Sequence, residues 1–194
     1  MASPQRLDAS RIAFRPLTGD DLGLLHRWLN TDFVMEWWGE EDRSFEDVVA
    51  EYAPRIAGER PTRGFVILHG TTPIGYIQTY MLRDYPDYSV HLGADEETAG
   101  VDLLIGEREY LHRGLGSAIL RRFLAEIVFG TMGARSCIID PEPDNKIAIR
   151  AYEKAGFRYL RTVQVPEEPH PSYLMRIERA ELAGDEPNEV AAQR

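Results

Sequence analysis

The segment His112-Arg-Gly-Leu-Gly116 combines glycines with a basic side chain between a predicted strand and a predicted helix. Glycines let the backbone approach a ligand closely, and the free N–H groups at a helix N-terminus bind phosphate oxygens. Arg113 would add a charge-assisted hydrogen bond to a phosphate. The segment therefore predicts a phosphate-binding loop, with a simple loop-to-helix turn as the alternative for so short a motif.

A second set of polar residues begins with the motif Asp140-Pro-Glu-Pro-Asp-Asn145. Asn145 stands at the start of a predicted helix, and Tyr152 follows seven residues later. Seven residues make about two helical turns, so the two side chains lie on the same helix face. Together with the glycine segment, this amide and phenol favour a ligand site over a plain turn.

Carboxylates are frequent at the predicted loops and strand ends, where they could line one cleft. They are Glu36, Asp87, Glu96, Glu97, Asp102, Asp140 and Glu167. A hydrogen bond to a charged group contributes about 1.5 to 3 kcal/mol when it is well formed, so such a cleft suits a polycation. A solvated acidic surface is an equal alternative for Glu96, Glu97, Glu167 and Glu168.

Aromatic and amide side chains add further candidates for binding an acceptor molecule. Trp37 and Trp38 are predicted in a loop, where paired indoles can stack on a sugar ring, while one of them anchors the first helices in the core. On a predicted hairpin, Gln78 and Tyr80 share a strand face with Tyr76 and could reach the same ligand.

The composition restricts the class of partner. The 194 residues include 32 acidic and 22 basic side chains, a formal net charge of −10, which repels nucleic acids and anionic membranes and favours cationic partners. No apolar run approaches the roughly 20 residues that cross a bilayer, and the N-terminus lacks a hydrophobic signal segment. The single cysteine, Cys137, cannot form an internal disulfide and is expected as a buried strand residue, so we expect a cytoplasmic protein.

Hydrophobic periodicity places these candidates in one domain, residues 11–182, between flexible ends at residues 1–10 and 183–194. Capping-box signals at Thr18 and Ser44 start two helices after a first strand. The predicted strands cover residues 12–17, 65–68, 74–81, 99–105, 136–140, 157–165 and 172–178. The polar segment 83–98 is predicted as a long loop, a feature that is often functional.

Two more helices flank the candidate ligand residues. One covers residues 115–129, and the other covers residues 145–155, with Asp144 as its N-cap and Gly156 as its C-terminal stop. This order of elements favours an α/β fold with one mixed sheet and helices packed on both of its faces.

The order of motifs resembles the acetyl-CoA-binding core of the GNAT superfamily of N-acetyltransferases, over about residues 11–178. The chain is similar within it to the aminoglycoside 6′-N-acetyltransferases, through Glu36-Trp-Trp-Gly39, Ile74-Gly-Tyr-Ile-Gln-Thr-Tyr80, Gly100-Val-Asp102 and Ile149-Arg-Ala-Tyr-Glu-Lys-Ala-Gly-Phe157. One departure is Leu111, where the superfamily often has Gln or Arg. The resemblance implies a GNAT-like fold with a mostly antiparallel central sheet of about seven strands.

The resemblance also implies roles for the candidates: acetyl transfer from acetyl-CoA to a primary amine, by direct attack in a ternary complex and without a metal. The cofactor side would comprise Leu104, Ile105, Arg113, Gly114, Leu115, Gly116, Ser117, Asn145 and Tyr152. The acceptor side would comprise Trp37, Trp38, Gln78, Tyr80, Asp87, Asp102, Asp140 and Glu167. Asp102 and Tyr152 would be catalytic.

Elementary acid–base chemistry restricts these two catalytic roles. An alkylammonium must lose a proton before it attacks a thioester, and a carboxylate with a pKa of about 3.9 is a poor acceptor for that proton. Asp102 is therefore expected to orient the amine and pass its proton to water. A phenol of pKa about 10 donates to a thiolate, whose thiol has a pKa of about 8.5, only at a cost of roughly 2 kcal/mol, so Tyr152 is expected to hydrogen-bond the sulfur.

The leading hypothesis is a 6′-N-acetyltransferase for a cationic aminoglycoside or another polyamine-like molecule, which implies antibiotic resistance, in a monomer or homodimer. One alternative is an acyltransferase that acts on a lysine side chain, a siderophore precursor or a polyamine. Another is a non-catalytic acyl-CoA sensor, against which the presence of both Asp102 and Tyr152 argues.

Overall fold

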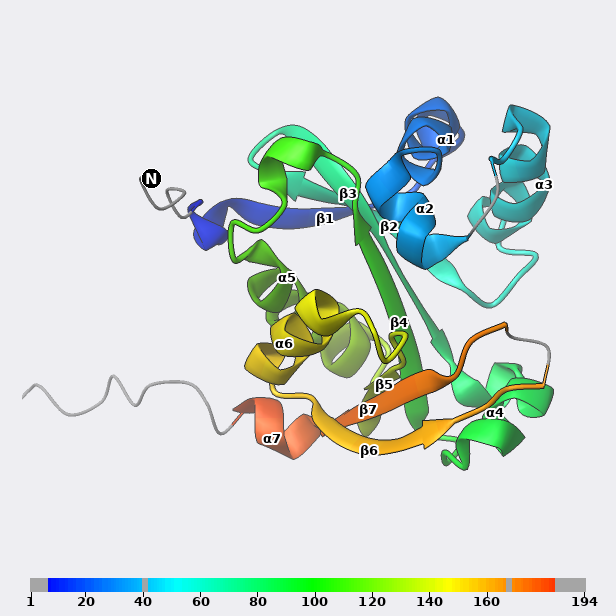
Figure 1. Ribbon diagram of the computed structural model, residues 1–194, viewed down its shortest axis with the longest axis vertical. Coiled ribbons are helices and arrows are strands. Elements are labelled where there is room, and N and C mark those ends of the chain that lie inside the picture. Colours follow the sequence, from blue (N-terminus) through cyan, green and yellow to red (C-terminus); the bar gives the residue numbers. More distant parts are fainter. Residues whose placement is uncertain (1–6, 40–41, 167–168, 184–194) are drawn as a thin grey trace, which may run out of the picture.

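The computed structural model describes residues 7–39, 42–166 and 169–183 of the chain. Seven strands form one sheet in the order β1-β2-β3-β4-β5-β7-β6, with helices on both of its faces (Figure 1). Neighbouring strands are antiparallel except β4 and β5, which are parallel. The predicted α/β fold with a mixed, mostly antiparallel sheet of seven strands is therefore confirmed.

The elements have the following bounds. The strands are Ile12–Pro16 (β1), Arg63–His69 (β2), Thr72–Met81 (β3), Thr98–Ile105 (β4), Ser136–Ile139 (β5), Arg158–Val163 (β6) and Ser172–Glu178 (β7). The helices are Leu22–Leu29 (α1), Asp32–Trp38 (α2), Phe45–Ile56 (α3), Pro86–Leu92 (α4), Leu115–Phe123 (α5), Lys146–Ala155 (α6) and Arg179–Ala183 (α7). Both predicted capping boxes, at Thr18 and Ser44, are present.

Apolar side chains pack on both faces of the sheet. Val101 of β4 belongs to the larger core together with Phe123 of α5, whereas Leu104 of β4 belongs to a second core together with Tyr52 of α3. Because side chains alternate along a strand, Asp102 lies on the same face as Leu104. Asp102 therefore faces the side of the sheet that α1, α2 and α3 cover, opposite to Val101, as predicted.

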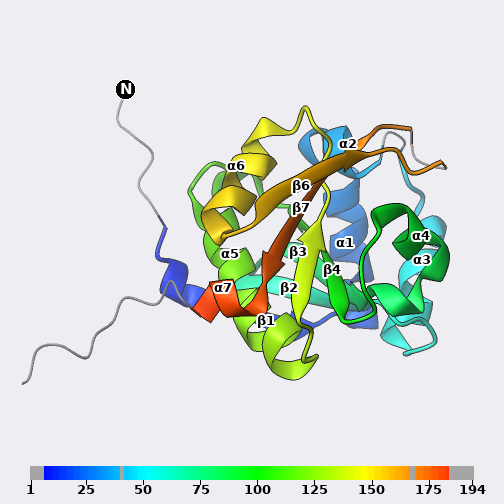
Figure 2. The same cartoon turned by 90° about the horizontal axis from the view of Figure 1, so that it is seen from below.

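The parallel pair in the middle of the sheet is short, and this positions the site. β4 is paired with β3 from Ala99 to Ile105, but its ladder with β5 ends at Gly100. Figure 2 shows α5 and α6 on one side of the strands and α1, α3 and α4 on the other. Beyond Gly100, the two halves of the sheet separate and leave room for ligands next to β4, where Leu103 lines two cavities.

The region of the paired tryptophans differs from its prediction. Trp37 and Trp38 were predicted in a loop, but both lie in the last turn of α2. Val34 of the same helix is buried in the core that α1 and α3 share. Tertiary packing therefore holds this seven-residue helix, which is too short to be stable through its own propensity.

Two local predictions on the candidate ligand segments were wrong. The polar segment 83–98 contains α4, which starts with Pro86 and ends with the fully buried Leu92. Proline suits the first helical position because its missing N–H is not needed there. The N-cap of α6 is Asn145 instead of Asp144, since the Asn145 Oδ1 accepts a hydrogen bond from the N–H of Ala148 at 3.0 Å.

The second half of the predicted helix 115–129 also differs, because α5 ends at Phe123 and continues as a π-helical segment, Leu124–Thr131. Gly156 ends α6 with a φ of 107°, as predicted. Cys137 is fully buried in β5, also as predicted. None of the helices within the described ranges is long and apolar enough to cross a membrane.

The predicted flexible ends lie largely outside the described residues, which exclude residues 1–6 and 184–194. Within the described part of the first segment, Asp8 caps a 3-10 turn at Ala9–Arg11.

Candidate active site

Two neighbouring cavities lie next to β4. The first, which we call the acidic cavity, has a volume of about 690 Å³ and is lined by Glu36, Asp102, Asp140 and Glu142 among others. The second, which we call the loop cavity, has a volume of about 550 Å³ and is lined by the loop before α5. Six residues line both cavities: Glu36, Trp37, Trp38, Leu103, Asn145 and Tyr152. A molecule in one cavity can therefore contact a molecule in the other.

The loop cavity is built around the N-terminus of α5. Eight of the nine predicted cofactor-side residues line it: Leu104, Ile105, Gly114, Leu115, Gly116, Ser117, Asn145 and Tyr152. Gly114 is the N-cap of α5 and has a φ of 78°, a conformation that favours glycine. A Cβ on Gly114 would meet no atom within 4 Å, so its backbone borders open space. This arrangement suits an anionic phosphate at the helix N-terminus.

The ninth residue, Arg113, is not among the residues that line the loop cavity, and its Nε donates to the carbonyl oxygen of Glu109 at 3.2 Å. Three other basic side chains line it, namely His112, Arg150 and Lys154. Arg150 and Lys154 are one helical turn apart on α6, on neighbouring positions of one face. The sequence alone did not single out Arg150 and Lys154, although their helical spacing after Asn145 places them on one face.

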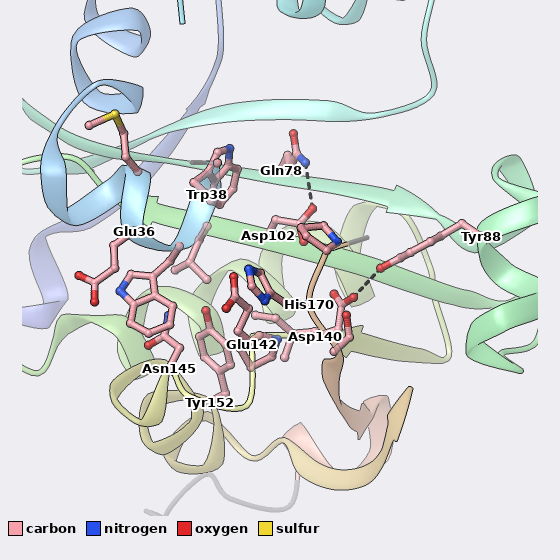
Figure 3. Close-up of a pocket in the computed structure, with 18 of the residues that line it drawn as sticks. Glu36, Trp38, Gln78, Tyr88, Asp102, Asp140, Glu142, Asn145, Tyr152 and His170 are labelled. Atoms are coloured by element: carbon pink, nitrogen blue, oxygen red, sulfur yellow. Dashed lines mark hydrogen bonds between the residues drawn. The ribbon is translucent and has the colours of Figure 1, made fainter. Parts of the chain in front are cut away.

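The centre of the acidic cavity is formed by neighbouring side chains of β3 and β4. Gln78 and Asp102 are direct partners in the antiparallel register, and the Gln78 Nε2 donates to the Asp102 Oδ2 at 2.9 Å (Figure 3). Tyr76 stands two residues before Gln78 on the same face of β3, and its hydroxyl donates to the Gln78 Oε1 at 2.9 Å. The carboxylate of Asp102 thus has a fixed partner on the cavity wall.

Tyr80 continues this row along β3 and lines the acidic cavity. A Cβ on Gly100, its partner on β4, would lie 2.5 Å from the Tyr80 ring, so glycine is needed for the ring to cross β4. Burial raises the pKa of the Tyr80 phenol well above its usual value. The predicted position of Gln78 and Tyr80 on one face with Tyr76 is confirmed.

Asp140 lies at the end of β5, on the far side of the acidic cavity. Its Oδ2 accepts a hydrogen bond from the Tyr88 hydroxyl at 2.5 Å (Figure 3). Tyr88 was missed by sequence reasoning because its segment was predicted as a loop, whereas α4 brings it to the site. Glu142 and His170 also line this cavity and were not predicted. No local sequence pattern distinguishes them from surface residues.

Tyr152 lies where the two cavities meet, two turns along α6 from Asn145. Burial, followed by the negative charges of Asp102 and Asp140, raises the pKa of its phenol well above the usual value. The hydroxyl therefore stays protonated at neutral pH and can act as a hydrogen-bond donor. A higher pKa also makes full proton transfer from Tyr152 less favourable than it would be for an ordinary tyrosine.

The paired tryptophans have different environments. Trp38 packs edge-on against Tyr76, with ring centroids 6.4 Å apart, and belongs to the core under α1 and α3. Trp37 is 36% exposed and lines both cavities. The expectation that one of the two indoles packs against the first helices is confirmed for Trp38, although both indoles line the two cavities.

Several predicted acidic residues are not brought to the site. Asp87 is exposed on α4 and does not line the acidic cavity. Glu96 and Glu97 are also exposed, and Glu97 accepts a hydrogen bond from Arg135 at 2.9 Å. Glu167 and Glu168 lie outside the described residues. The solvated-surface alternative therefore holds for Glu96 and Glu97.

The lining of the acidic cavity is strongly anionic. Its carboxylates are Glu36, Glu51, Asp102, Asp140 and Glu142, and no Lys or Arg lines it in the part of the chain that the structure describes. Over the same part of the chain, no group of three or more His, Cys, Asp or Glu side chains could hold a metal ion. Such a lining suits an organic polycation that carries several ammonium groups.

Comparison with known protein families identifies one matching family model. Residues 18–165 match the acetyltransferase (GNAT) domain. The chain is 33% identical over 171 residues to the aminoglycoside N(6′)-acetyltransferase type 1 of Klebsiella pneumoniae, a match that covers 87% of this chain and 84% of that protein.

Solved structures show the same similarity. The structure of AAC(6′)-Ib in complex with paromomycin and acetyl-CoA superposes with a TM-score of 0.82 at 30% identity, covering 91% of this chain and 98% of that one. The structure of the same aminoglycoside acetyltransferase with coenzyme A and kanamycin has a TM-score of 0.80 at 30% identity, with coverage of 90% and 98%.

Proposed function

The chain belongs to the GNAT acetyltransferase family, and we propose that it transfers the acetyl group of acetyl-CoA to the 6′-amine of an aminoglycoside. The observation that carries this proposal is the junction of the two cavities at Asn145 and Tyr152. One cavity suits a phosphate-bearing molecule and the other suits a polycation. The names of the relatives, which are aminoglycoside 6′-N-acetyltransferases, support this assignment of the two molecules.

On the cofactor side, the N-terminus of α5 would hold the pyrophosphate through the backbone from Gly114 to Ser117. The free edge of β4 beyond Gly100, at Leu104 and Ile105, would hold the pantetheine arm. Arg150 and Lys154 are candidates for further phosphate contacts, in place of the Gln or Arg that is absent at Leu111. Acetyl-CoA supplies the acetyl group as a thioester that an amine can attack.

On the acceptor side, Asp102 would bind the ammonium group that becomes the nucleophile. The amine attacks the thioester carbonyl after it has lost a proton, and the carbon–sulfur bond then breaks. A carboxylate is a weak base toward an ammonium ion, so Asp102 would orient the amine and let the proton pass to water.

Tyr152 would donate a hydrogen bond to the sulfur as the thiolate leaves. The raised pKa of its phenol supports this role because it keeps the hydroxyl protonated. The same shift argues against complete transfer of that proton to sulfur, since a thiol has an ordinary pKa of about 8.5. A hydrogen bond in the transition state is sufficient to stabilise developing negative charge.

The remaining ammonium groups of the acceptor would bind Glu36, Asp140 and Glu142, while the exposed ring of Trp37 would contact a sugar ring. The single cysteine and the absence of any disulfide requirement support a cytoplasmic enzyme, where acetyl-CoA is available. Antibiotic resistance would be the biological consequence, and a monomer or a homodimer would both fit this assignment.

A panel of acceptors tests the substrate class. Purified protein is incubated with acetyl-CoA and either an aminoglycoside, a linear polyamine or a lysine peptide, and release of the CoA thiol is measured. We expect the highest kcat/KM for the aminoglycoside. Higher kcat/KM for the polyamine or the peptide would transfer the assignment to that alternative, and acetyl-CoA binding without thiol release for any amine would indicate a sensor.

A further inference from the structure

A chain of hydrogen bonds runs from α3 to the carboxylate of Asp102. The Arg55 Nη1 donates to the Gln78 Oε1 at 2.8 Å, and the Tyr76 hydroxyl donates to the same oxygen at 2.9 Å. The Gln78 Nε2 then donates to the Asp102 Oδ2 at 2.9 Å. Arg55 does not line the acidic cavity, and these hydrogen bonds connect its guanidinium to Asp102 through Gln78.

The two donors determine how the amide of Gln78 is oriented. An amide oxygen only accepts hydrogen bonds and an amide nitrogen only donates them. With Arg55 and Tyr76 both donating to the oxygen, the nitrogen must face Asp102. The reversed amide would direct its N–H groups at a guanidinium and its oxygen at a carboxylate, which are both repulsive contacts.

Arg55 is itself held on three sides. Its Nη2 donates to the Glu51 Oε1 at 2.8 Å, and its guanidinium carbon lies 4.7 Å from the centre of the Tyr52 ring. The other Glu51 oxygen accepts from the Arg43 Nη1 at 2.7 Å. The fork of Arg55 therefore binds Glu51 and Gln78 at the same time, a geometry that the single ammonium group of lysine cannot reproduce.

We propose that Arg55 is a positioning residue for acetyl transfer, which orients Asp102 through the amide of Gln78. This role rests on the proposed function, in which Asp102 binds the reacting ammonium group. When Arg55 is removed, the Gln78 oxygen keeps only the donor from Tyr76, so the amide nitrogen is held less firmly toward Asp102. Glu51 is then not an acceptor-binding carboxylate, because Arg43 and Arg55 already pair with it.

A double-mutant cycle tests whether Arg55 acts through Gln78. The variants are Arg55→Met, Gln78→Leu and the double variant, with kcat measured for the aminoglycoside at saturating acetyl-CoA. We expect each single variant to lower kcat about tenfold and the double variant to be no slower than Gln78→Leu, because coupled residues are not additive. The KM for acetyl-CoA should stay within about twofold of the wild-type value, because the loop cavity is unchanged.

Arg43→Met is the matched control for this cycle. It removes the other guanidinium from Glu51 but has no contact with Gln78. We expect kcat to remain within about twofold of wild type, since the amide keeps both of its donors. An equal loss in Arg43→Met, or additive losses in the double variant, would show that Arg55 has only a structural role and would overturn the proposal.

A second readout does not need turnover. The pKa of the Asp102 carboxyl is measured in the free protein by carbon-detected NMR. We expect Arg55→Met to raise this pKa in the wild-type background and to have much less effect in the Gln78→Leu background. If Gln78→Leu does not fold, Gln78→Met provides the second background, because it also removes the amide that links Arg55 to Asp102 without adding a charge.

These readouts separate two failures. If the wild type acetylates no amine but the pKa cycle is non-additive, the proposed function is wrong while the link from Arg55 to Asp102 is correct. If the wild type is active but the pKa of Asp102 responds to Arg55→Met equally in both backgrounds, the link through Gln78 is wrong.

Discussion

Gln78 and Asp102 lie directly opposite each other in the β3–β4 ladder, and the amide of one donates to the carboxylate of the other at 2.9 Å. Because strand register sets this pairing, a slip of β4 by one residue would turn Asp102 to the other face of the sheet, away from Gln78. The core below Leu104 and the core around Val101 prevent such a slip, since both faces of β4 carry buried apolar side chains. The packing of the whole sheet therefore determines where the carboxylate of Asp102 lies.

Asp102→Asn keeps the shape of this side chain and removes its charge. We expect kcat to fall about 10²- to 10⁴-fold, the range of a lost acid–base group, because the reacting ammonium loses its anionic partner and proton route. Calorimetry should show unchanged affinity for acetyl-CoA, for which we propose the other cavity. Full activity in Asp102→Asn would exclude this carboxylate from catalysis.

Tyr152→Phe removes only a hydroxyl group. If that group donates a hydrogen bond to the leaving sulfur, its loss should cost about 1 to 2 kcal/mol, or roughly 5- to 30-fold in kcat. The measurement is single-turnover thiol release at saturating substrates. A loss as large as that of Asp102→Asn would mean that Tyr152 must transfer its proton completely, despite the raised pKa.

Gly114→Val should abolish binding of CoA by covering the backbone at the N-terminus of α5. Gly58 provides a matched control, because its φ of 76° is close to the 78° of Gly114 and a Cβ on either residue meets nothing within 4 Å. Both variants should lose a similar stability of about 1 to 2 kcal/mol from the left-handed backbone. Calorimetry should show a loss of CoA affinity in Gly114→Val but not in the control variant Gly58→Val. Equal affinities in the two variants would exclude the proposed phosphate-binding site at the N-terminus of α5.

The ion pair between Arg15 and Asp21 predicts a pH-dependent stability. The hydrogen bond from Arg15 lowers the pKa of the buried Asp21 from 3.8 to about 2. Above about pH 5 the carboxylate is ionised in both states and its contribution is complete; the contribution is lost as the pH falls toward about 2, because the unfolded chain binds the proton first. Asp21→Asn should lower the free energy of unfolding by about 2 kcal/mol at pH 7.

Urea denaturation at several pH values checks this expectation. The difference between the wild type and Asp21→Asn should shrink steadily between about pH 5 and pH 2. A difference that stays constant over this interval would mean that the charge of Asp21 contributes no stability.

The parts of the site that depend on local patterns could be predicted from the sequence. Strand alternation placed Gln78 and Tyr80 on one face, and helical spacing placed Asn145 and Tyr152 together. These predictions succeed because the periods of strands and helices are fixed by backbone geometry.

The parts that depend on long-range packing could not be predicted. Tyr88 reaches Asp140 across 52 positions of the sequence, on a short helix that buried Leu92 holds in place. In the sequence, Arg55 looks like an ordinary charge near the end of α3. Arg55 contacts Gln78 only because α3 packs on the face of the sheet that carries Leu104 and Asp102.

Two aminoglycosides that differ only in the nucleophile show whether the enzyme acetylates the 6′-amine. A kanamycin-type substrate with a 6′-amine and its 6′-hydroxyl analogue keep the same remaining ammonium groups, so both should bind the acidic cavity. Thiol release and NMR of the product should show one acetyl group on the 6′-nitrogen of the first compound and no turnover of the second. Equal turnover of the two compounds, or an acetyl group on a different amine, would contradict the account.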